Sequence, residues 1–136
     1  MKIFALRLKP EQDLKKSLKN FVINNNIQAG FILTAVGSLQ QVTIRFANQN
    51  ESKVLFDKFE IVSLVGTVSV NGVHLHISIA DSEGITKGGH LVDGCLIYTT
   101  AEIVIGESEN VIFSRQIDQQ TGYLELEIIP RNEPTI

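Results

Sequence analysis

The residues best suited to chemistry in this chain are its three histidines, which all fall between residues 66 and 90. His74 and His76 are two positions apart in an alternating apolar run, and His90 follows the pair Gly88-Gly89. Because side chains alternate between the two faces of a β-strand, we expect His74 and His76 on the same face. Imidazole binds Zn, Cu, Fe and Ni, and three imidazoles with an open coordination position make a reactive metal site. The sequence therefore indicates a site for a divalent metal, zinc above all, at His74, His76 and His90.

The turn before His74 sets which residues share its face. Asn71-Gly72 is the strongest short-range signal for a β-hairpin, and it predicts that Val70 pairs with Val73 and Ser69 with His74. One face of this hairpin is then apolar and the other is polar, with both histidines on the polar face. The polar face is expected to carry Ser63, Thr67, Ser69, His74, His76 and Ser78.

The position of His90 depends on the next loop. If residues 81–84 form a four-residue loop, His90 falls opposite Leu75, on the core face. It then reaches the other two histidines only through a bulge at Gly88-Gly89 or from another subunit. The alternative to a metal site is a pair of surface histidines on a solvated or inter-subunit face and a third histidine in a turn.

The remaining reactive groups point to structural roles. Cys95 has no adjacent base in the sequence and is expected to be a buried structural thiol. Glu102 lies inside an apolar run and needs a partner, for which Arg45, Arg115 or a histidine are available. No Ser/His/Asp arrangement stands out, so the sequence favours a non-catalytic protein over an enzyme and indicates no catalytic residues.

The pattern along the chain predicts an α+β fold. Pro10 and an apolar stripe at Leu14, Leu18, Phe21 and Val22 predict one packed helix over about residues 10–25. Lys15, Lys16 and Lys19 fall off this stripe and form either a solvated face or a nucleic-acid patch. The rest of the chain has period two, which predicts a mostly antiparallel sheet or half-barrel. The strands are expected at residues 2–8, 30–37, 41–47, 59–70, 73–80, 96–105, 111–115 and 123–129.

Length and composition narrow the class of protein. The 136 residues suit a single domain, with 43% hydrophobic and 20% charged residues. The net charge of −3 counts against tight DNA binding by this chain alone, although a local basic patch remains compatible with it. A single cysteine excludes an intrachain disulfide, and no apolar run is long enough to span a membrane. We therefore expect a cytoplasmic protein.

Seven segments together carry a resemblance that none of them carries alone. The chain resembles the plants-and-prokaryotes conserved (PPC) domain family, in its stand-alone prokaryotic form without an AT-hook. The resemblance runs over nearly the whole chain, with residues 1–130 as the domain and residues 131–136 as a C-terminal tail. It is carried by Gly37-Ser38-Leu39, Thr43-Ile44-Arg45, residues 59–68, residues 74–81, Gly88-Gly89-His90-Leu91, Gly94-Cys95 and residues 99–105.

The resemblance implies an α+β homotrimer with a DNA-associated or transcription-regulatory role that is not catalytic. Plant members combine the domain with AT-hooks, but no Arg-Gly-Arg-Pro core occurs here, so a minor-groove arm is missing. The implied partners are other copies of the chain, and DNA or other regulatory proteins. The alternative is a metal-binding protein or metal-dependent enzyme, because His74, His76 and His90 match positions that can hold a metal in prokaryotic members.

Overall fold

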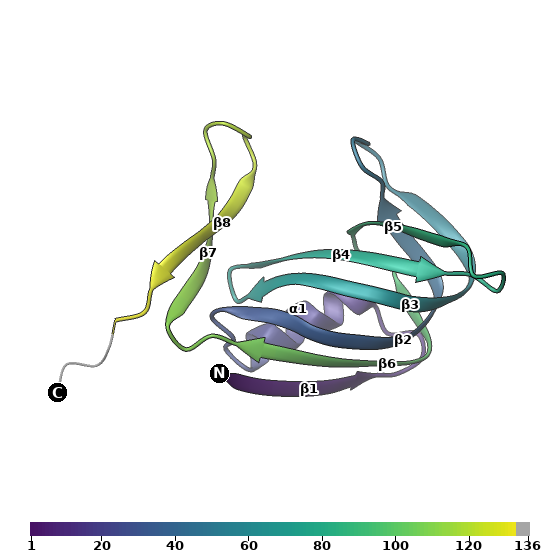
Figure 1. The fold of residues 1–136 in the computed structure, drawn as a ribbon, viewed down its shortest axis with the longest axis horizontal. Helices are drawn as coiled ribbons and strands as arrows, with labels where there is room; N and C mark the ends of the chain where they lie inside the picture. Colours follow the sequence, from purple (N-terminus) through teal and green to yellow (C-terminus); the bar gives the residue numbers. More distant parts are fainter. Residues whose placement is uncertain (133–136) are drawn as a thin grey trace.

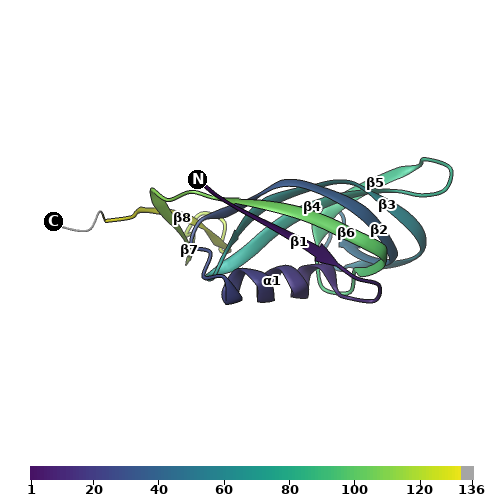
Figure 2. The same cartoon turned by 90° about the horizontal axis from the view of Figure 1, so that it is seen from below.

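The protein consists of a six-stranded antiparallel sheet, one helix across a face of that sheet, and a separate two-stranded hairpin (Figure 1). This computed structural model describes residues 1–132. Figure 2 shows the helix lying beneath the strands as a second layer. The elements are β1 (Lys2–Leu8), α1 (Leu14–Asn24), β2 (Gly30–Arg45), β3 (Lys53–Ser69), β4 (Gly72–Ala80), β5 (Thr86–Leu91), β6 (Leu96–Glu107), β7 (Val111–Ile117) and β8 (Leu124–Pro130).

The sheet curls back on itself along β2. Its strand order is β1-β6-β2-β3-β4-β5, and the end of β2 also pairs with β5. In that second pairing Ile44 lies opposite Leu91 and Arg45 opposite His90. The strands from β2 to β5 therefore close a half-barrel, and the predicted α+β class with an antiparallel sheet and one packed helix is confirmed.

The helix begins later than the sequence pattern suggests. It starts at Leu14, and the Asp13 side chain caps it by accepting a hydrogen bond from the backbone N–H of Lys16 at 3.0 Å. The prediction that Pro10 occupies the first turn is wrong, because Pro10 lies in the turn before the cap. The predicted stripe is confirmed, since Leu14, Leu18 and Val22 are fully buried.

Strand β2 is a single strand where the sequence suggested two. It runs from Gly30 to Arg45, with an irregularity in its pairing between Leu39 and Gln41 where we expected a break. The side chains of Leu39, Val42 and Ile44 are fully buried on either side of that irregularity. A bulge therefore keeps the apolar side chains on the core face without interrupting the strand.

The first residue after β8, Arg131, is held by two contacts with the rest of the chain. The Arg131 N–H donates to the carbonyl of Asn110 at 2.9 Å, and its guanidinium lies 4.0 Å from the buried carboxylate of Glu107. Residues 133–136 of the expected C-terminal tail lie outside the described residues, and the domain boundary at residue 130 stays a prediction. No helix in the described part of the chain combines the length and apolar character needed to cross a bilayer.

Candidate metal centre

The first turn of the site lies one residue earlier than predicted, which shifts the pairing of β3 with β4 by two residues. Ser69 pairs with Gly72, so Val70 and Asn71 form the two-residue turn, and Thr67 rather than Ser69 lies opposite His74. The predicted register is therefore wrong. A shift of two residues leaves every side chain on its original face, so His74 and His76 do share the face opposite to the buried Leu75 and Ile77.

The cause of the different turn lies in a later strand. The carbonyl of Phe113 on β7 accepts hydrogen bonds from the Ser69 hydroxyl and the Asn71 side-chain amide, both at 2.9 Å. The backbone N–H of Asn71 also donates to the Ser69 hydroxyl at 3.1 Å. These contacts hold Ser69 and Asn71 inside the turn region and favour the observed register.

A five-residue loop brings His90 to the other two histidines. Asp81–Ile85 connects β4 to β5, and the Asp81 carboxylate accepts hydrogen bonds from the N–H groups of Glu83 and Ile85 at 2.9 and 3.0 Å. With one residue more than the expected four, the register places His90 directly opposite His76. The expectation that His90 lies opposite Leu75 is wrong. Neither a bulge at Gly88-Gly89 nor a second subunit is needed, because those glycines pair regularly with Ser78 and Ile77.

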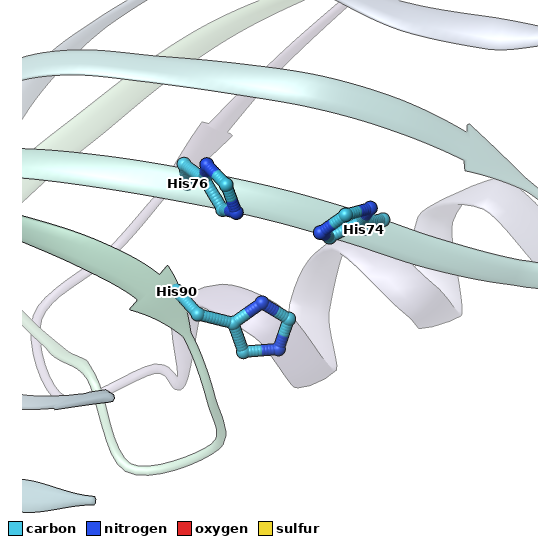
Figure 3. Close-up of side chains that lie close together, drawn as sticks. All are labelled: His74, His76 and His90. Carbon is cyan, nitrogen blue, oxygen red and sulfur yellow. The ribbon is translucent and has the colours of Figure 1, made fainter. Parts of the chain in front are cut away.

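The three imidazoles form a compact cluster on β4 and β5 (Figure 3). One ring nitrogen from each of His74, His76 and His90 lies within 4.8 Å of the others. The ring centroids of His74 are 5.1 Å from His76 and 5.4 Å from His90, and those of His76 and His90 are 5.9 Å apart. Three imidazole nitrogens this close together can share one zinc ion, to which imidazole binds at about 2.0–2.1 Å.

The surroundings of the cluster favour neutral imidazoles. Partial burial, and then the positive charge of Arg45, lowers the pKa of His90 to about 4. Partial burial also lowers the pKa of His74, with further contributions from His76 and Arg115. Both rings are therefore neutral near pH 7 and present a free lone pair, which is the form that binds a metal.

Gly66 allows β3 to approach the strand that carries the histidines. It has a φ of 151°, and a Cβ at this position would lie 2.0 Å from the carbonyl oxygen of His74. Only glycine fits such a contact, so Gly66 marks a close approach of two backbones.

The histidines lie on the wall of a hollow of about 1070 Å³ between the β7–β8 hairpin and the loop after β2. Figure 1 shows these two segments rising on either side of β4 and β5. Two arginines, Arg45 and Arg115, also line the hollow, together with Tyr123 and Glu125. Sequence reasoning did not connect the residues of β7 and β8 with the histidines, because no local pattern indicates that this hairpin folds over β4.

The other reactive residues lie away from the cluster. Cys95 is fully buried, and its thiol exchanges hydrogen bonds with the backbone of Thr43 at 3.2 and 3.3 Å, which confirms the structural role predicted for it. Glu102 is exposed on β6, opposite Arg7 of β1 and Val36 of β2. It does not line the histidine hollow, and as an exposed carboxylate it has no need of a buried partner.

The chain belongs to the family of the Plants and Prokaryotes Conserved (PCC) domain, whose model matches residues 1–109. The resemblance predicted from the sequence is thereby confirmed. The bifunctional protein GlmU of Synechococcus sp. (strain JA-3-3Ab) is 53% identical over 128 residues. The match covers 94% of this chain but 21% of that protein, so the chain spans about a fifth of the curated relatives' length.

Solved structures of similar chains agree with the fold. A hypothetical protein from Salmonella enterica is 41% identical, has a TM-score of 0.94, and is matched over 96% of this chain and 95% of its own. A protein from Archaeoglobus fulgidus described as metal-containing is 28% identical, with a TM-score of 0.79 and coverage of 93% and 94%. A structure from Bacteroides thetaiotaomicron, named as a candidate DNA-binding protein, is 24% identical with a TM-score of 0.81 over 92% and 91%, and shows the shared fold.

Proposed function

We propose that this chain is a metal-binding domain in which His74, His76 and His90 hold one divalent ion, with zinc the best match. The observation that carries the proposal is the convergence of the three ring nitrogens within 4.8 Å of one another. Three nitrogen ligands from imidazole are a donor set that zinc accepts, and such sites leave a further coordination position for water or a ligand. The metal-containing relative from Archaeoglobus fulgidus supports the proposal.

The chain's own residues set the properties of this centre. The pairing of β4 with β5 fixes His76 opposite His90, so two of the three donors are positioned by backbone hydrogen bonds. The third donor, His74, is held two residues away on the same strand. A zinc ion bound with an open position would act as a Lewis acid and lower the pKa of a bound water to about 7.

Metal analysis of the purified protein tests the proposal. We expect close to one equivalent of zinc in the wild type and a loss of most of it in His76→Ala. Ser78→Ala is the matched control, because Ser78 is two residues further along β4 and offers no imidazole. Circular dichroism of each variant without metal checks that the fold is kept. Equal metal content in the wild type and His76→Ala, or none in either, would exclude the site.

We infer a second role, in regulation, from the basic residues on α1 and at the end of β2. Burial lowers the pKa of Lys15 on α1, and the nearby charges of Lys19 and Arg45 lower it further, while Asp93 and Asp13 act in the opposite direction. None of the three basic residues forms an ion pair within the described chain. A local positive surface of this kind supports a DNA-associated role despite the net charge of −3.

The homotrimer expected from the family belongs to this second proposal. Apolar side chains are exposed on the sheet face away from the core, and subunit packing would cover them. These are Ile3, Leu33, Val36, Val62 and Val65.

Two measurements test the regulatory proposal separately. Light scattering should give three times the mass of the chain, and a monomer would exclude the trimer. Affinity for duplex DNA should fall steeply with salt and weaken in the double variant Lys15→Gln/Lys19→Gln. Binding that is absent or independent of salt would exclude the DNA-associated role.

A further inference from the structure

Two arginines that form no ion pair among residues 1–132 flank the histidine cluster on opposite sides. Arg45 lies opposite His90 in the pairing of β2 with β5. Arg115 reaches over from β7 and donates to the Thr67 hydroxyl at 3.0 Å, and Thr67 lies opposite His74. The Arg115 guanidinium is therefore held near His74, the exposed Arg45 is paired with His90, and both can bind a further acceptor.

The hollow carries a net positive charge. Its charged residues are Arg45, Arg115 and Glu125, which leaves one positive charge in excess before any metal binds. A divalent ion on the histidines would raise the excess to about three positive charges, and such a hollow attracts anions.

The shape and walls of the hollow suit a small molecule. Its volume of about 1070 Å³ is at the upper end of the range for ligand pockets, roughly 300–1,000 Å³. Polar groups line part of it, while Phe46, Val73, Tyr123 and Leu124 provide apolar surface. Tyr123 and Leu124 are 72% and 58% exposed, so the hairpin offers apolar area that a ligand could cover.

We propose that this hollow binds a small organic anion, a carboxylate or a phosphate ester, one oxygen of which reaches the metal held by His74, His76 and His90 while Arg45 and Arg115 neutralise its charge. The proposal rests on the metal site proposed above. Zinc accepts oxygen ligands at its open position, and the planar guanidinium matches the two oxygens of a carboxylate or phosphate. The apolar wall would contact the organic part of the ligand.

Cobalt(II) in place of zinc gives a direct readout, because its visible spectrum changes when an anion enters the coordination shell. The probes are benzoate and phenyl phosphate, which share a ring and differ in the anionic group, and neutral benzamide as the control. Calorimetry with the same probes gives the dissociation constants. We expect one or both anions to bind and shift the spectrum, and benzamide to do neither. The tighter of the two anions identifies the class of ligand.

Three substitutions separate this proposal from the metal site itself. Arg45→Gln and Arg115→Gln should each raise the dissociation constant of the anion about tenfold or more, and should keep the metal because all three histidines remain. Arg7→Gln is the control, since it removes the same charge from β1 at the far edge of the sheet. Two results would overturn the anion site and leave the metal site intact. The first is a protein that binds metal but no anion. The second is a protein that binds metal and anion, in which neither Arg45→Gln nor Arg115→Gln weakens anion binding more than Arg7→Gln does. A wild type that binds no metal would overturn both proposals.

Discussion

The helix-covered sheet and the β7–β8 hairpin are stabilised in different ways. On β6, Ile103 and Ile105 are buried in the core that α1 covers. On β8 every residue from Leu124 to Pro130 is exposed. Polar contacts fix the base of the hairpin. Among them, the N–H of Phe113 donates to the carbonyl of Gln28, and the carbonyl of Phe113 accepts from the Ser69 hydroxyl.

This difference assigns the two regions separate tasks. Apolar burial in the covered layer supplies most of the free energy of folding. The hairpin contributes little burial in the single chain, but it carries Arg115, Tyr123 and Glu125 to the histidine hollow. A wall of this kind can contact a ligand or another subunit at small cost to the fold.

Matched isoleucine substitutions give the largest expected contrast between the two regions. Ile103 is 1% exposed and Ile128 is 59% exposed. Ile103→Ala should lower the free energy of unfolding by about 3 kcal/mol through lost burial and a new cavity, whereas Ile128→Ala should change it by less than about 0.5 kcal/mol. Urea unfolding of both variants measures the two values. A large loss for Ile128→Ala as well would show that a ligand or another subunit covers the hairpin in solution.

Much of the covered layer could be predicted from the sequence, because local periodicity encodes it. The stripe of Leu14, Leu18 and Val22 identified the helix and its buried face. The start of the helix was predicted too early, because one contact of the capping residue Asp13 is with a distant part of the chain and leaves no local sequence pattern. Asp13 also accepts a hydrogen bond from the N–H of Gly94, which is 81 residues away in the chain.

The sequence predicted which three histidines form the site, but it did not predict how the strands that carry them pair. Alternation along β4 placed His74 and His76 on one face even though the turn was assigned one residue late and the pairing was therefore shifted by two. The position of His90 depended on whether the preceding loop had four or five residues, and a change of one residue reverses every side chain. The place of Arg115 in the hollow could not be predicted, because the approach of β7 to β3 depends on contacts between distant segments, among them the hydrogen bond from Arg115 to Thr67.

The Asp13 cap gives the next largest effect and tests how the helix is joined to the sheet. Asp13→Ala removes hydrogen bonds to the N–H groups of Lys16 and Gly94, of 3.0 and 2.7 Å. We expect a loss of about 1–2 kcal/mol in the free energy of unfolding. Asp57→Ala is the control, because Asp57 is exposed and bonds only to the N–H of the next residue. Equal losses in the two variants would contradict the cap.

Cys95 and His90 show that removal from water, complete for the thiol and partial for the imidazole, favours the neutral form of either kind of group. Burial raises the pKa of the Cys95 thiol from 9.0 to about 11. The unfolded chain therefore loses this proton first, and stability falls as the pH rises from 9 toward 11. From the shift we expect a loss of about 1 kcal/mol by pH 10, the smallest effect considered, measured by urea unfolding between pH 8 and 10. Cys95→Ala lacks the titrating group and should lose less over the same range. Parallel pH profiles for the two proteins would mean that the thiol does not couple to folding, and that its burial is shallower than the contacts with Thr43 indicate.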